Sequence, residues 1–130
     1  MAKFDSPETA YNLFEALFEI LLDDETFVSK ARALNLSLHL IHTKPDLELS
    51  VSPDTGVVAG APRQPAAIRI KMSCDTAHAL WMGELLMPLA LATGKVRVRG
   101  SVAKVLEFVP ILRPAFDVYP KLAAERGIAA

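Results

Sequence analysis

The chain has 130 residues, a net charge of −1 and 52% hydrophobic residues. This length suits one compact domain spanning residues 1–130, and the balanced charge excludes a protein whose main task is to coat nucleic acid. The single cysteine, Cys74, excludes an internal disulfide framework, and no apolar run reaches the ~20 residues that span a bilayer. The hydrophobic fraction exceeds the usual ~45–50%, so the surplus is expected to line a cavity, an interface or a membrane contact.

Two helices are predicted at the start of the chain. Ser6 followed by Pro7 is a typical helix start, because the hydroxyl caps the first turn and proline fits the first helical position. Apolar residues at helical spacing then continue to Leu21. The acidic segment 23–25 interrupts this pattern and caps a second, shorter helix that runs to about Leu34.

From residue 36 the hydrophobic period changes to two, which predicts strands. A turn at Pro45 separates the first two strands so closely that they form an antiparallel hairpin. In the last predicted strand, the valines point inward and three cations point outward. The predicted strands cover residues 36–41, 46–51, 56–60, 68–73 and 95–99.

Short helices are predicted between and after these strands. One covers residues 77–83 behind a cap at 73–76, and an apolar helical segment ends at Thr93-Gly94. A further helix is capped by Ser101, with Leu106 and Val109 expected to face the core. The prolines in the tail predict two short, kinked helical pieces instead of one continuous helix; they are Pro110, Pro114 and Pro120.

These elements predict an α+β domain, with a mostly antiparallel sheet that has one wet face and one face covered by helices. Charge is divided unevenly along it. Residues 1–60 carry ten acidic and four basic side chains, whereas residues 61–130 carry five acidic and ten basic ones. Either the two halves attract each other across the sheet, or a basic surface with Lys95, Arg97 and Arg99 meets anionic lipid heads or a phosphate.

Residues that could carry chemistry are few. His39 and His42 are three apart on a strand, so they point to opposite faces and cannot chelate together. Cys74 and His78 share the i, i+4 spacing of one helical face, but a zinc site needs three or four ligands. The sequence therefore predicts no metal, no cofactor and no enzyme, and leaves Cys74 with His78 as the one candidate reactive pair.

The apolar surplus is concentrated in residues 81–91 and in the tail from Leu106 to Tyr119. Two interpretations stay open. These side chains pack a core and a dimer surface, or they form the wall of a cavity for an apolar ligand.

The order of three segments adds a resemblance. Residues 68–73, then 80–85, then the glycine-bounded strand 93–100 resemble the sterol carrier protein 2 domain family over about residues 66–109. The resemblance implies a five-stranded sheet with helices that enclose an apolar tunnel. It also implies non-enzymatic binding, and transfer, of a sterol, fatty acid, acyl-CoA or phospholipid.

By matched position, the resemblance places Trp81, Leu85, Leu89, Leu106 and Val109 at the tunnel wall. It assigns Phe108, Leu112 and Phe116 to the closing helix or lid. The chain departs from the family after Gly83, where the apolar segment 86–89 replaces a polar turn and would form a greasy mouth or a dimer contact.

The leading prediction is thus a lipid-binding domain whose partner is an apolar lipid or lipid-like small molecule. A transient membrane-surface contact and a homodimer stay open, whereas nucleic acid is not expected. The alternative is an accessory module that uses the same apolar surface for protein interaction. A cytoplasmic location is expected, since the end of the chain, residues 127–130, carries no peroxisomal signal.

Overall fold

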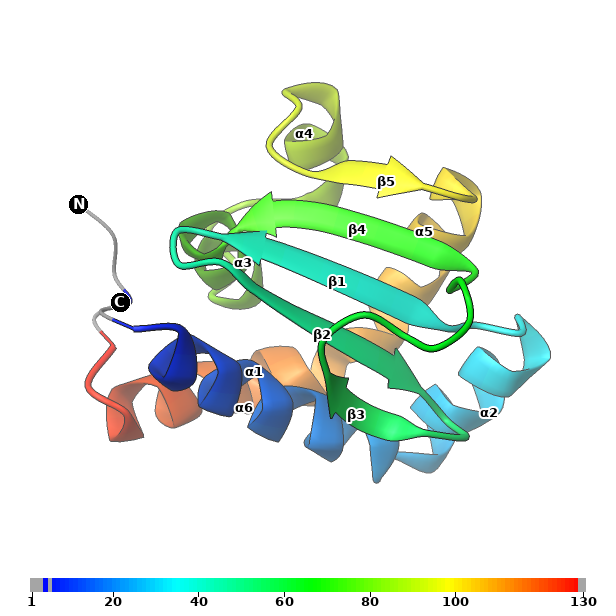
Figure 1. The fold of residues 1–130 in the computed structure, drawn as a ribbon, viewed down its shortest axis with the longest axis horizontal. Coiled ribbons are helices and arrows are strands. Elements are labelled where there is room, and N and C mark those ends of the chain that lie inside the picture. The colour runs from blue at the N-terminus through cyan, green and yellow to red at the C-terminus, as the bar shows by residue number, and fades with distance from the viewer. Residues whose placement is uncertain (1–3, 5, 129–130) are drawn as a thin grey trace.

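The structure is a computed structural model that describes Phe4 and residues 6–128. A five-stranded sheet with the order β3-β2-β1-β4-β5 forms one layer, and the helices lie against one of its faces (Figure 1). This arrangement confirms the α+β class. The strands are β1 (Leu38–Thr43), β2 (Leu47–Ser52), β3 (Gly56–Ala59), β4 (Ile68–Ser73) and β5 (Arg97–Arg99).

Along the chain, helices come before the first strand, between β4 and β5, and after the last strand. None of the helices in the described part of the chain is long and apolar enough to cross a membrane. They are α1 (Pro7–Leu22), α2 (Glu25–Ala33), α3 (Cys74–Trp81), α4 (Met87–Ala92), α5 (Val102–Phe108), the 3-10 helix η1 (Val109–Leu112) and α6 (Arg113–Glu125).

The sheet is mostly antiparallel, as predicted, but its central pair is parallel. β2 runs antiparallel to β1 and β3, and β5 runs antiparallel to β4. β1 and β4 are parallel, with Leu38 opposite Ile68 and Thr43 opposite Ser73. Because parallel neighbours need a long crossover, β2, β3 and the loop after them form the connection between these two strands.

Alternation along β1 separates the two faces of the sheet. Leu38, Leu40 and His42 are buried on the inner face, beneath the helices. His39 points the other way, and its Nε2 lies 2.6 Å from Glu48 Oε1 on β2. The two histidines therefore lie on opposite faces, as their spacing predicted.

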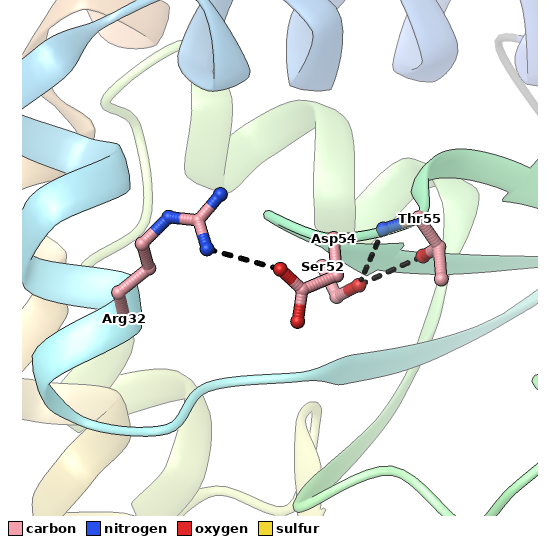
Figure 2. Close-up of polar contacts among 4 residues, drawn as sticks. All are labelled: Arg32, Ser52, Asp54 and Thr55. Carbon is pink, nitrogen blue, oxygen red and sulfur yellow. Dashed lines mark hydrogen bonds and ion pairs between the residues drawn. The ribbon is translucent and has the colours of Figure 1, made fainter.

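The turn between β2 and β3 is held by local polar contacts (Figure 2). The backbone N–H of Thr55 donates to Ser52 Oγ at 3.1 Å, a bond that spans the turn. Arg32 of α2 reaches Asp54 Oδ1 at 3.0 Å. Both partners of this ion pair are largely exposed, so it contributes little to stability.

Four helices begin at the side-chain caps predicted from the sequence. Ser6, Asp24, Ser73 and Ser101 each accept a hydrogen bond from a backbone N–H three residues later. The cap at Ser73 starts α3 at Cys74, three residues before the predicted start.

The predicted core face of the helix after Ser101 is wrong in part. Val105 is fully buried and Phe108 is 4% exposed, whereas Leu106 is 40% exposed. In a helix of two turns, a shift of one residue rotates the buried stripe by about 100°. The stripe continues from Phe108 to the buried Leu112 of η1, and Leu106 faces away from it.

The prolines of the tail act differently from one another. Pro110 and Pro114 lie in the first turns of η1 and α6, where a missing N–H costs nothing. Pro120, however, lies inside α6 without ending it, so the prediction of two short pieces is wrong there. The buried Tyr119 and Ala123 anchor the helix on both sides of the proline, and this packing offsets the lost hydrogen bond.

Candidate functional site: an apolar cavity under the sheet

A cavity of about 120 Å³ lies between the inner face of the sheet and the helices. Its sheet wall comes from the two central, parallel strands. β1 contributes Leu38, Leu40 and His42, and β4 contributes Ile70 and Met72. Because β strands alternate, every second residue of each strand faces the cavity.

An aromatic cluster forms the opposite wall. Trp81 at the end of α3 lies between Phe18 of α1 and Phe116 of α6, and all three residues line the cavity. The Trp81 ring meets Phe18 edge-on with 5.8 Å between centroids, and its centroid lies 5.3 Å from that of Phe116. These separations are typical of favourable aromatic pairs, so helices from both ends of the chain hold this wall together.

The connection between α3 and α4 marks the mouth of the cavity. Gly83, Leu85, Leu86 and Met87 all line it. Leu86 is nevertheless 69% exposed, so the same side chain contacts both the cavity and the solvent. The segment that replaces a polar turn of the resembled family thus provides an apolar rim.

The cavity brings together six of the eight ligand-binding residues predicted from the sequence, and two lie elsewhere. Leu89 is 56% exposed on α4, and Leu106 is 40% exposed on α5. Both were assigned by matching single positions in short helices, where a small rotation moves a side chain from core to solvent. The six that line the cavity are Trp81, Leu85, Phe108, Val109, Leu112 and Phe116.

Sequence reasoning did not assign the strand residues of the cavity wall to the site, and His42 is the titratable one among them. Its side chain is only 4% exposed, and its Nδ1 is buried without a hydrogen-bond partner among the described residues. Burial lowers the pKa of His42 from 6.5 to about 4, so the ring is neutral at pH 7. The period-two pattern of β1 could have placed His42 in the wall, because His42 follows Leu38 and Leu40 on the apolar face of this strand.

The candidate reactive pair in α3 is a buried structural cluster. The thiol of Cys74 is fully buried and donates a hydrogen bond to the Pro45 carbonyl over 3.3 Å. Burial and two nearby carboxylates raise the pKa of Cys74 to about 12, so little reactive thiolate forms at neutral pH. His78 Nδ1 lies 2.7 Å from the Tyr119 hydroxyl, which links α3 to α6 beneath the cavity wall.

Among Phe4 and residues 6–128, no three His, Cys, Asp or Glu side chains lie together in a group that could hold a metal ion. The candidate site is therefore defined by shape and apolar lining.

The outer face of the sheet carries a basic strip on β4 and β5. Arg69 is directly opposite Arg99, and Lys71 is directly opposite Arg97. All four side chains are exposed, and none of them forms a salt bridge within the described residues. Like charges in facing positions destabilise a sheet, so the fold alone gives no reason for this strip.

Comparison with solved structures shows that this sheet, with its covering helices, is the fold of sterol carrier protein 2 domains. The sterol carrier protein 2 of Yarrowia lipolytica, in its apo form, aligns with a TM-score of 0.65 and 16% identity over 89% of this chain and 99% of its own. Domain 2 of the Helicoverpa armigera sterol carrier protein gives a TM-score of 0.67 and 15% identity over 86% and 93%.

A third similar structure contains a ligand. The Aedes aegypti sterol carrier protein 2, solved in complex with palmitate, has a TM-score of 0.62 and 18% identity over 82% of this chain and 96% of its own. No protein-family model and no curated protein matches the chain. The resemblance found in the sequence is thus confirmed at the level of the fold.

Proposed function

We propose that this protein binds a lipid or lipid-like apolar molecule in the cavity beneath the sheet and carries it without chemical change. The observation that supports the proposal is the combination of an apolar wall with an apolar rim at Leu86. Each methylene group that leaves water for such a cavity gains about 0.8 kcal/mol. The palmitate complex of the Aedes aegypti protein supports the same ligand class.

The size of the cavity decides how a long ligand would enter. A dry cavity of ~150 Å³ binds a molecule the size of benzene, and this cavity is of about 120 Å³. One end of a lipid therefore enters, and the rest of its chain lies along the rim between Gly83 and Met87. Apolar contacts involve no covalent step, so the ligand leaves by the same route, which is what transfer requires.

Two features favour loading and release at an anionic membrane surface. The facing cations of β4 and β5 give a concentrated positive strip, and each such cation near an anionic membrane contributes about 1 kcal/mol of attraction. The exposed Leu86 offers an apolar contact at the mouth.

A second candidate function is a protein-interaction or dimerisation module. Leu86 and Leu89 support it, because they are large apolar side chains exposed at 69% and 56% on neighbouring positions of the α4 region. A stable dimer whose interface covers these two residues and closes the mouth would favour this module over a carrier.

The test uses Trp81, the single tryptophan, as a reporter inside the cavity wall. Titration with palmitate or hexadecanol should change its fluorescence in a saturable way, at one ligand per chain. Val109→Phe adds bulk to the cavity wall without adding a second tryptophan to the fluorescence signal. This variant should weaken binding at least about tenfold. Leu106→Phe is the matched control on an exposed position, and it should bind as the wild type does. Equal binding by both variants would contradict the cavity as the site.

A further inference from the structure

The wall of the cavity includes a buried imidazole, that of His42. Of the described residues that line the cavity, His42 alone can both donate and accept a hydrogen bond through its side chain. The ring is 4% exposed, and its Nδ1 has no hydrogen-bond partner among the described residues. A buried polar atom left without a partner costs about 1–3 kcal/mol.

The packing around His42 leaves its ring little freedom to turn toward another hydrogen-bond partner. Its ring stacks on Phe14 of α1, with 4.7 Å between centroids and 13° between planes. Directly opposite His42 on the two adjacent strands are Leu47 of β2 and Met72 of β4, which offer no strong side-chain hydrogen bond. The imidazole is therefore held in place beside the cavity with unused hydrogen-bonding capacity.

The chemistry of the wall restricts which group could use that capacity. No Lys, Arg, Asp or Glu is among the described residues that line the cavity. A carboxylate or phosphate brought beside His42 would be buried without a counter-ion, which is costly. A hydroxyl or a carbonyl, in contrast, pairs with a neutral imidazole at no such cost.

We propose that His42 is a specificity residue that binds a neutral hydroxyl or carbonyl group at the buried end of the ligand. This inference rests on the proposed binding of apolar molecules in the cavity and adds the class of ligand. The favoured ligand is an apolar molecule, such as a long-chain alcohol, sterol or phenol, that enters with its neutral polar group first. An ionised lipid enters tail first and keeps its charged group at the rim.

Toluene and phenol test this directly, because they have nearly the same shape and suit a cavity of about 120 Å³. Their dissociation constants are measured by NMR titration for the wild type and for His42→Leu. The variant should lose about five- to tenfold more affinity for phenol than for toluene, the equivalent of one hydrogen bond. His39→Leu, on the opposite face of the same strand, is the matched control and should change neither constant.

A second measurement needs no variant to fold. In the wild type labelled with ¹⁵N-histidine, phenol should shift the ring nitrogens of His42 far more than toluene does, and should leave those of His39 unchanged. Equal shifts with both compounds, or an unchanged phenol-to-toluene ratio in His42→Leu, would overturn the role of His42. If neither compound binds the wild type, the proposed function itself fails instead.

Discussion

The imidazole of His42 stacks on the ring of Phe14, with 4.7 Å between centroids and 13° between planes. This contact joins the central strand β1 to helix α1. It also keeps the imidazole out of water, which disfavours its charged form. His42 is thus neutral at pH 7 and forms part of the apolar wall, whereas the same side chain on the surface would titrate near pH 6.5.

The first prediction concerns stability against pH. The pKa of His42 is about 4 in the folded protein and 6.5 without burial, so between these values only the unfolded chain binds the proton. Stability due to this group is therefore complete above about pH 7 and falls as the pH drops to 4, by roughly 3 kcal/mol. Urea denaturation at pH 7.5 and pH 4.5 should show this loss in the wild type and a smaller loss in His42→Phe. Equal losses would contradict the burial of a neutral His42.

The second prediction concerns the basic strip. Arg99→Glu replaces a repulsive pair with Arg69 by an attractive one, so the free energy of unfolding should rise by about 0.2–1 kcal/mol. The same variant should bind less well to vesicles that contain an anionic phospholipid, with the difference vanishing at high salt. Lys121→Glu, an equal charge change on the exposed side of α6, is the control for net charge. Vesicle binding that falls equally in both variants would argue against a specific strip.

The third prediction concerns the two glycines that bound the last strand. A Cβ on Gly100 would lie 2.6 Å from the Ala67 carbonyl oxygen, whereas a Cβ on Gly94 would meet nothing within 4 Å. Both residues have positive φ, which costs other residues about 1–2 kcal/mol. Gly94→Ala should therefore lower the free energy of unfolding by about that amount, and Gly100→Ala by clearly more, because backbone atoms must also shift. Chemical denaturation of the two variants measures the difference, and equal losses would contradict the close approach at Gly100.

Local signals predicted much of this fold. The caps at Ser6, Asp24, Ser73 and Ser101 were all predicted, although α3 begins three residues earlier than expected, because a cap depends only on atoms within three residues. Strand faces were predicted equally well, since a period of two leaves no intermediate orientation. The parallel pairing of β1 with β4 depends on a long crossover, and neither strand carries a local signal for it.

The cavity was predicted less completely, for reasons that individual residues make clear. Leu89 and Leu106 belong to helices of six and seven residues, where the apolar stripe is too short to fix its rotation. The sequence analysis considers His42 only as a possible metal ligand and rejects that role. Its position on the inner side of β1 nevertheless makes it a polar residue on an apolar face. Pro120 was expected to break α6, but contacts made by Tyr119 and Ala123 across the fold outweigh its local effect.

If the protein is a lipid carrier, an apolar molecule occupies the cavity beneath the sheet. Methyl-resolved NMR during a titration with hexadecanol tests it most directly, because Leu40, Ile70 and Leu112 line the cavity and are nearly fully buried. We expect saturable shifts of these methyl groups at one ligand per chain, with intermolecular contacts to the ligand chain. Shifts confined to the exposed Leu86 and Leu89, with the buried methyl groups unchanged up to the solubility limit, would contradict it.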